Sequence, residues 1–231
     1  MKIDLYADGA NEKDILFFNN KKKIRGLTTN PSLMRKSGIK NYEIFAKKIL
    51  KKVKKPISFE VFSDDFNEMY NQAIKISSWG KNVYVKIPIS NSKGKSSINL
   101  IKKLSNKKIK LNITAIFTYD QIKKVIKAVG NKTPSIISIF AGRIADTGRD
   151  PEPYMKFAYK LAKNKKTVKI LWASTREVFN ITQAERCKSH IITVPTNILN
   201  KLSIKNYNLK KYSKKTVKEF YKDALAAGYK I

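Results

Sequence analysis

One lysine of this chain interrupts a run of apolar residues. Lys86 lies between Val85 and Ile87, in a segment of strand length that ends at Pro88. Burying an ammonium ion costs free energy, so such a strand favours the neutral amine, which can attack a carbonyl carbon and form a Schiff base. The alternative is that the side chain reaches solvent at the end of the strand. Strand context alone does not separate these two interpretations.

Two acidic residues occupy matching positions at the ends of other apolar segments. Asp8 follows Ile3–Ala7, and Glu60 lies in Ser58-Phe59-Glu60-Val61. Together with a Schiff-base lysine, two carboxylates supply the general acid and general base that carbon–carbon bond cleavage requires. Each could instead be a buried carboxylate that is neutralised by one of the many lysines.

Amide and hydroxyl side chains follow two further apolar segments. Thr29 and Asn30 come directly after Thr28, and Asn112 and Thr114 share one face of a strand because they are two residues apart. These groups can hold substrate hydroxyls or a catalytic water. The alternative is turn chemistry, since Asn followed by Pro commonly opens a turn.

A phosphate site is expected after the sixth and seventh apolar segments. The sixth ends in Ser138-Ile139-Phe140-Ala141-Gly142-Arg143, and the seventh in Ala173-Ser174-Thr175-Arg176. Guanidinium groups, the Ser174 hydroxyl and the backbone N–H groups of a helix start can hold an anion. Only six residues are arginine, so Arg143, Arg149 and Arg176 indicate a need for planar, bidentate geometry. Barrels usually bind phosphate after strands seven and eight, so this site would lie one strand early.

Other signals in the sequence are weak. Gly94-Lys95-Ser96 lacks the first glycine of a phosphate-binding P-loop, since Ile89 takes that position. His190 is the only histidine and is expected to be structural, and no cluster of metal ligands is visible. Cys187 is the only cysteine, which excludes a disulfide within the chain.

The elements that would position these candidate residues can be predicted from hydrophobic patterning. Along the chain, short apolar segments alternate with amphipathic segments. Most of the segments are apolar at consecutive positions, as in parallel strands that are covered on both faces. Eight such units predict an α/β fold, a single (β/α)8 TIM barrel domain over residues 1–231, with an open doubly wound sheet as the alternative. The predicted strands are Ile3–Ala7, Ile24–Thr28, Ile57–Phe62, Val83–Ile87, Ile109–Ile116, Ser135–Phe140, Val168–Ala173 and Ile191–Val194.

Helical periodicity separates the predicted strands. The clearest helices are Phe66–Ser77, which Gly80 follows, and one that begins with a capping box of Thr118 and Gln121. An extra C-terminal helix is predicted over Lys214–Ala227. We expect the tail, residues 201–231, to cover the barrel or to form a subunit contact in a homo-oligomer. The other predicted helices are Asn11–Asn19, Tyr42–Val53, Ser97–Leu104, Pro153–Lys163 and Glu177–Glu185.

The composition excludes several classes of protein. The net charge of +32 comes mostly from lysines that are spread along the chain, whereas arginine, which nucleic-acid surfaces favour, is scarce. We therefore expect a solvated basic surface and no specific nucleic-acid site. No apolar run is long enough to span a membrane, and Asp4 near the start does not fit an export signal, so a cytoplasmic protein is expected.

Four motifs together resemble the transaldolase family in its short-chain form. They are Gly26–Leu33, Val85–Pro88, Phe140–Ile144 and Ala173–Arg176, in the order of the family and over nearly the whole chain. Each motif is weak alone, but the combination is highly specific. The resemblance implies a β/α barrel that acts on sugar phosphates and needs neither a metal nor an organic cofactor.

The resemblance also implies a role for each candidate residue. Lys86 would form the Schiff base, Asp8 would be the acid/base group, and Glu60 with Thr114 would activate and hold the catalytic water. The substrate-binding residues would be Asn30, Thr29, Asn112, Ser138 and Phe140, and the phosphate-binding residues Arg143, Ser174 and Arg176.

The implied reaction transfers a dihydroxyacetone unit from sedoheptulose 7-phosphate or fructose 6-phosphate to an aldose phosphate, as in the pentose phosphate pathway. The related fructose-6-phosphate aldolase branch carries Gln in place of Glu60 and Tyr in place of Phe140, so both residues favour a transferase. Ala145 departs from the family, where an acid is common. The alternatives are an aldolase-like lyase that releases free dihydroxyacetone, a different acceptor, and a basic nucleic-acid-binding protein on an inactive barrel.

Overall fold

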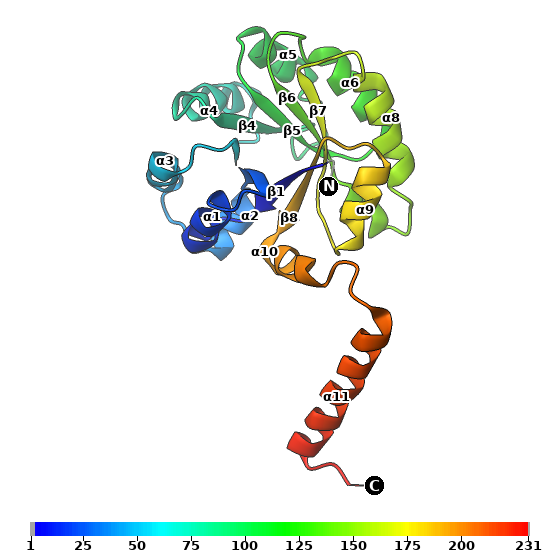
Figure 1. Ribbon diagram of the computed structural model, residues 1–231. Coiled ribbons are helices and arrows are strands. Elements are labelled where there is room, and N and C mark those ends of the chain that lie inside the picture. Colours follow the sequence, from blue (N-terminus) through cyan, green and yellow to red (C-terminus); the bar gives the residue numbers. More distant parts are fainter. Residues whose placement is uncertain (1–2, 231) are drawn as a thin grey trace. The chain divides into compact units, whose positions relative to one another are not determined.

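The computed structural model describes residues 3–230. Eight parallel strands follow one another in chain order around a closed barrel, in which β1 pairs with both β2 and β8 (Figure 1). The predicted (β/α)8 barrel is therefore confirmed, and the open sheet is wrong. The strands are β1 Asp4–Asp8, β2 Ile24–Thr28, β3 Ile57–Glu60, β4 Val83–Pro88, β5 Leu111–Ile116, β6 Ser135–Ile139, β7 Val168–Trp172 and β8 Ile191–Pro195.

Helices connect successive strands, and most lie where the periodicity predicts. Thr118 and Gln121 form the predicted capping box at the start of α6. The short helices α2, α7 and α10 were not predicted, because a helix of one or two turns is too short to show a period. The helices up to α10 are α1 Glu12–Asn19, α2 Pro31–Lys36, α3 Tyr42–Lys52, α4 Phe66–Ser78, α5 Ile98–Asn106, α6 Tyr119–Ala128, α7 Ala141–Ala145, α8 Glu152–Ala162, α9 Phe179–Arg186 and α10 Thr196–Leu199.

Four predicted strands are shorter in the structure, two of them by a single residue and the other two by two residues. The fifth begins at Leu111 and not at Ile109, because Lys108 adopts a left-handed backbone conformation with φ of 60° that turns the chain. The third ends at Glu60 and not at Phe62, because β2 has already turned away. Apolar composition continues beyond both strand ends, so composition alone overestimates their length.

The chain divides into two compact units, one that ends at Leu199 and one that begins at Asn200. The second unit contains a 3-10 helix, Asn200–Ile204, and helix α11, Leu209–Ala227. The predicted start of this last helix at Lys214 is wrong, because Asn208 caps a helix that already begins at Leu209. A single domain over 1–231 and a homo-oligomeric role for the tail stay predictions, and residues 1, 2 and 231 of that range lie outside the described residues.

Inside the barrel, a layer of apolar side chains lies next to the polar side chains at the carboxyl ends of the strands. Gly26 makes room in it for Tyr6, since a Cβ on Gly26 would lie 2.4 Å from the tyrosine ring. Side chains alternate along a strand, so Asp8 and Lys86 share a face with the layer residues two positions before them. Polar groups therefore gather at the carboxyl ends of the strands, where barrels hold their sites. The layer consists of Tyr6, Ile136, Leu171, Ala173 and Ile191, with Tyr84 and Phe140 packed against it.

Candidate active site

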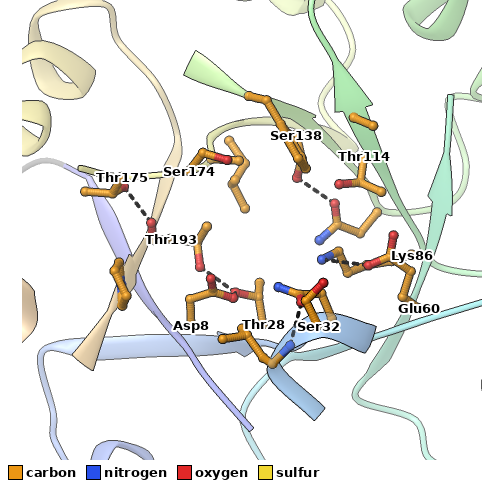
Figure 2. Close-up of a pocket in the computed structure, with 18 of the residues that line it drawn as sticks. Asp8, Thr28, Ser32, Glu60, Lys86, Thr114, Ser138, Ser174, Thr175 and Thr193 are labelled. Atoms are coloured by element: carbon orange, nitrogen blue, oxygen red, sulfur yellow. Dashed lines mark hydrogen bonds and ion pairs between the residues drawn. The ribbon is translucent and has the colours of Figure 1, made fainter. Parts of the chain in front are cut away.

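A cavity of about 480 Å³ opens among the carboxyl ends of the strands and the loops after them (Figure 2). Of the residues to which the family resemblance assigns a role, all but one line this cavity, although they are spread over most of the chain. The exception is Thr29. The predicted residues on its wall are Asp8, Asn30, Glu60, Lys86, Asn112, Thr114, Ser138, Phe140, Arg143, Ser174 and Arg176.

Lys86 lies in the floor of the cavity with its amine held on two sides. The Nζ group donates a hydrogen bond to the carbonyl oxygen of Thr29 at 2.8 Å and lies 3.2 Å from Oε2 of Glu60. Glu60 and Lys86 are partners in the register of β3 and β4, which brings the carboxylate to the amine. The lysine side chain is only 9% exposed, so it does not reach out to bulk solvent. A proton can pass between the two groups over this distance.

Asp8 faces Lys86 and Glu60 across the cavity (Figure 2). Its Oδ1 accepts a hydrogen bond from the Thr28 hydroxyl at 2.7 Å, and that hydroxyl also contacts the hydroxyl of Thr193. Burial raises the pKa of the Asp8 carboxyl, although Lys86 and the Thr28 hydrogen bond act in the opposite direction. A carboxyl group with a raised pKa is suited to taking up and returning a proton.

Asn112 belongs to a chain of side-chain hydrogen bonds across three strands. Its amide nitrogen donates to Oγ of Ser58 at 3.0 Å, and its Oδ1 accepts from Oγ of Ser138 at 2.6 Å. All three residues are buried, so these bonds determine the orientation of the amide. Ser58 was not predicted as a site residue, and it positions Asn112 from β3.

Thr114 lies on the cavity wall beside an irregular step in β5. The register between β5 and β6 shifts between Ile113 and Ile116, and Ala115 has a left-handed backbone with φ of 57°. Such backbone strain is concentrated at functional sites. Within the described part of the chain, Oγ1 of Thr114 is buried and has no hydrogen-bond partner. An unpartnered hydroxyl on a cavity wall can hold a water or a substrate oxygen.

Thr29 and Asn30 contribute in different ways. The Thr29 side chain is fully buried and donates to the carbonyl oxygen of Ser58 at 2.8 Å, so the structure does not bring it to the cavity. Thr29 instead supplies the carbonyl that holds Lys86. The Asn30 oxygen caps α2 by accepting from the N–H of Leu33 at 2.9 Å. This cap uses the amide oxygen, so the amide nitrogen can serve a ligand.

Unusual backbone geometry forms the rim of the cavity where β7 ends. Ser174 has a left-handed backbone with φ of 62°, and a Cβ on Gly142 would lie 1.6 Å from the Ser174 carbonyl oxygen. The N–H of Gly142 donates to the carbonyl of Ala173 at 3.2 Å. Only glycine allows the loops after β6 and β7 to meet this closely. Their contact brings Arg143 and Ser174 to the same part of the wall.

The two arginines of the rim are held by different contacts. Nη2 and Nε of Arg176 donate to the carboxylate of Asp146 at 2.6 Å and 3.0 Å, and the Arg176 backbone N–H donates to Asn180 Oδ1 at 2.8 Å. The Arg143 guanidinium lies over the Phe140 ring, 5.5 Å from its centre. Two guanidinium groups and the Ser174 hydroxyl can therefore give a phosphate several charge-assisted hydrogen bonds.

Residues 5–231 match the family model described as Transaldolase/Fructose-6-phosphate aldolase. The chain belongs to this family. A probable transaldolase of Clostridium kluyveri is 34% identical over 198 residues, which cover 85% of this chain and 88% of that relative. Probable transaldolases of Methanococcus maripaludis and Nitrosopumilus maritimus are 33% and 32% identical, and each match covers 87% of this chain.

The fold of this transaldolase-family protein is also similar to the crystal structure of KGPDC from Streptococcus mutans. The TM-score is 0.58, and the match covers 86% of this chain and 90% of that one. Sequence identity is only 11%, so this similarity concerns the fold alone.

Several wall residues of this transaldolase-family protein were not predicted as site residues. Thr28 is the register partner of Asp8 on the neighbouring strand. Both residues lie at the ends of their predicted strands, so Thr28 could have been predicted to lie beside Asp8. Thr193 reaches the same place because β8 closes the barrel onto β1, which no local pattern reveals. Ser32 and Lys36 line the wall from α2, a helix that was itself not predicted.

Other conspicuous residues of this transaldolase-family protein do not line the cavity. His190 Nδ1 accepts from the N–H of Ile170 at 3.0 Å, and burial lowers the pKa of this histidine. Arg149 donates to the Thr147 hydroxyl, and burial raises the pKa of the Cys187 thiol to about 12. Among residues 3–230, no group of three or more His, Cys, Asp or Glu side chains is arranged to hold a metal. No helix in this range is long and apolar enough to cross a membrane.

Proposed function

We propose that this protein is a transaldolase that transfers a dihydroxyacetone unit through a Schiff base on Lys86. The observation that carries the proposal is the buried Lys86 amine, 3.2 Å from the Glu60 carboxylate in a cavity that also holds Asp8. Membership of the family supports this class of reaction. The proposed donors are sedoheptulose 7-phosphate and fructose 6-phosphate, which exchange with erythrose 4-phosphate and glyceraldehyde 3-phosphate in the cytoplasmic pentose phosphate pathway.

The first step joins Lys86 to the ketose. The neutral amine attacks the carbonyl carbon, and the resulting carbinolamine loses its oxygen as water. Glu60 takes a proton from the attacking nitrogen and delivers one to the departing hydroxyl group, which the 3.2 Å separation allows. The Thr114 hydroxyl, which has no hydrogen-bond partner in the described residues, holds the water.

Carbon–carbon cleavage then depends on Asp8. Its carboxylate takes the proton of the C4 hydroxyl, the C3–C4 bond breaks, and the bonding electrons move into the iminium group. The C4 oxygen becomes the carbonyl oxygen of the aldose that leaves, and a dihydroxyacetone enamine stays on Lys86. An acceptor aldehyde reverses these steps, with the proton returned from Asp8, and water then hydrolyses the new imine. The raised pKa of Asp8 supports this alternation between acid and base.

The phosphate group of each substrate binds at the rim. Arg143, Ser174 and Arg176 hold it, while Asn30, Asn112 and Ser138 hold the hydroxyl groups of the dihydroxyacetone unit. This arrangement is supported by the distribution of charge in the cavity, because Arg143 and Arg176 are on the wall after β6 and β7 and Lys86 is in the floor.

Reduction of the imine tests the proposal directly. Incubation with fructose 6-phosphate and sodium borohydride should convert the imine to a stable secondary amine. Peptide mass spectrometry should then find the added mass on Lys86 and not on Lys110, a half-buried lysine of the same barrel that does not line the cavity. Turnover without an adduct on Lys86 would contradict the proposal, and binding of DNA without any adduct would favour an inactive barrel.

A lyase that releases free dihydroxyacetone is the second candidate, since the family description names both activities. Two residues favour transfer over release. Phe140 presents an apolar ring to the cavity and no hydroxyl that could position a hydrolytic water. Glu60 is a carboxylate where the aldolase branch carries an amide. A coupled assay for free dihydroxyacetone, with and without an acceptor aldehyde, separates the two activities.

A further inference from the structure

Glu60 lies where the hydrogen-bond ladder of the barrel is incomplete. It is the last residue of β3, but β2 pairs with β3 only as far as Thr28 and Ser58. The Ser58 carbonyl faces β2 and accepts from the N–H of Thr29. The backbone alternates with a period of two, so the N–H and carbonyl of Glu60 face the same side, where β2 has already ended. Both groups need another partner, because unpaired backbone groups inside a protein are costly.

Tyr42 supplies that partner with a single hydroxyl group. Its oxygen accepts from the Glu60 N–H at 2.7 Å and its proton is donated to the Glu60 carbonyl at 3.0 Å. A phenolic hydroxyl can donate and accept at the same time. Burial raises the pKa of Tyr42, so the hydroxyl keeps the proton that it donates. A side chain from α3 thus completes the end of β3 in place of β2.

The Tyr42 ring is held in an aromatic cluster that limits the movement of its hydroxyl. Ring centres of Phe59, Phe62 and Trp79 lie 6.1, 5.7 and 5.9 Å from its own. The backbone of Tyr42 is fixed as well, because it is the first residue of α3 and follows the helix cap Asn41. The hydroxyl is therefore a rigid point against which the strand end rests.

We infer that Tyr42 is a positioning residue for Glu60, an inference that rests on the proposed function. Tyr42 does not line the cavity, so it is not in a position to contact a substrate bound there. It holds both backbone polar groups of Glu60, whose carboxylate must stay 3.2 Å from the Lys86 amine. Without the hydroxyl, the strand end can rotate and carry Oε2 away from Nζ. The steps that use Glu60 should suffer, whereas phosphate binding at Arg143 and Arg176 should not.

The first test is Tyr42→Phe, which removes one oxygen and keeps the ring. We expect kcat to fall by roughly tenfold to a hundredfold, the range for a reacting group misplaced by about 1 Å. Imine formation, followed by borohydride quenching in a single turnover, should slow equally. Inhibition by inorganic phosphate should stay unchanged. The matched control is Ser105→Ala, which removes a buried hydroxyl that accepts from the Gly130 N–H at 2.9 Å and does not line the cavity.

A double variant separates positioning from a general structural role. If Tyr42 acts through Glu60, Tyr42→Phe combined with Glu60→Gln should be no slower than Glu60→Gln alone. Losses that multiply would overturn the inference, and so would a Tyr42→Phe kcat within twofold of the wild-type value. A kcat loss in Ser105→Ala as large as in Tyr42→Phe would overturn it too.

If the proposed function is wrong, the experiments give a result that differs from failure of the inference about Tyr42. A wild-type protein that forms no borohydride adduct contradicts the Schiff-base chemistry. Hydrogen exchange of the Glu60 amide then decides whether Tyr42 holds the strand end. Faster exchange in Tyr42→Phe than in the wild-type protein supports this role, and unchanged exchange overturns it.

A second substitution serves if Tyr42→Phe does not fold. Incorporation of 3,5-difluorotyrosine at position 42 keeps the ring and the hydroxyl but makes the hydroxyl more acidic. Once it ionises it cannot donate to the Glu60 carbonyl, so kcat should fall as pH rises through the pKa of the fluorinated phenol. A pH profile identical to that of the wild-type protein would overturn the inference.

Discussion

The floor and the rim of the cavity are built in different ways. Glu60, Lys86 and Asn112 in the floor are register neighbours on three consecutive strands, and the backbone ladder brings them together. Arg143 and Arg176 on the rim are exposed and lie in the segments after β6 and β7. Their placement depends on one glycine contact, on the Phe140 ring under Arg143 and on the surface ion pair between Arg176 and Asp146. The floor is therefore rigid by construction, and the rim is held by contacts that single substitutions can remove.

Two aspartates show the same contrast in their electrostatics. Burial raises the pKa of Asp8 at the end of β1, whereas hydrogen bonds from Arg176 lower the pKa of Asp146 at the rim. Asp146 is therefore a stable counter-charge that orients an arginine, while Asp8 is held in an environment unfavourable to its charge. Such an environment is typical of a group that exchanges protons during a reaction.

The largest expected effect is the loss of activity when Lys86 in the floor is replaced. Lys86→Arg keeps a positive charge but cannot form an imine, so transfer activity should fall by at least about a thousandfold while the fold survives. Coupled assays and circular dichroism measure the two properties. Lys110→Arg is the control, since it makes the same change at a half-buried lysine that does not line the cavity. Residual activity of Lys86→Arg within about tenfold of the wild type would contradict the assignment.

The next largest effect is expected when the close backbone contact at Gly142 in the rim is disrupted. Gly142→Ala puts a Cβ against the Ser174 carbonyl, where only 1.6 Å is available, so the two loops must separate. We expect a loss of about 3 kcal/mol in the free energy of unfolding and weaker phosphate binding. Gly9→Ala is the control, because its Cβ would meet nothing within 4 Å. Equal stability of the two variants in urea unfolding would show that the close approach is unimportant.

Removing one rim charge should have a smaller and selective effect. Arg143→Ala should weaken binding of phosphorylated substrates by about 2–3 kcal/mol, because a charge-assisted hydrogen bond is lost. Glyceraldehyde, which has no phosphate, should be affected much less as an acceptor. Arg149→Ala provides the control, since Arg149 is not on the cavity wall. Equal losses for both acceptors would mean that Arg143 has a structural role only.

Replacement of the desolvated Asp8, which faces the floor across the cavity, should stabilise the fold. A carboxyl with a raised folded-state pKa stabilises the fold only at low pH, and this contribution is lost as pH rises through the raised value. Asp8→Asn should therefore unfold at a higher temperature than the wild type at neutral pH, with a gain of about 0.5–2 kcal/mol. The gain should disappear when the pH is lowered below the usual Asp range, and activity should be lost at every pH. Thermal unfolding of both proteins across this pH range checks the sign.

The smallest effect concerns the balance between the two reactions. Phe140→Tyr adds a hydroxyl near the position proposed for the catalytic water, with little change in volume. It should raise the release of dihydroxyacetone from fructose 6-phosphate by a few-fold and lower the rate of transfer. The measurement is the ratio of the two products with and without an acceptor aldehyde. A wild-type protein that already releases dihydroxyacetone as fast as it transfers it would support the aldolase alternative.

Much of the floor could be predicted from the sequence. Apolar strands of consecutive Val, Ile and Phe are visible in the sequence, and a lysine or a carboxylate inside one is conspicuous by contrast. Lys86, Glu60 and Asn112 were therefore found from their own strands. Thr29 shows the limit of this reasoning, because its side chain faces Ser58 and only its carbonyl reaches the lysine.

The sequence by itself determined the order of strands and helices, because burial of apolar segments follows from composition and spacing. It also determined which polar residues end the strands. Only the tertiary structure decided which of these residues meet. Closure of the barrel brings Thr193 of β8 to Thr28 beside Asp8, and the early end of β2 leaves the Glu60 backbone to Tyr42. Both depend on where a neighbouring strand starts, stops or closes, and such relations between distant segments leave no pattern in either segment alone.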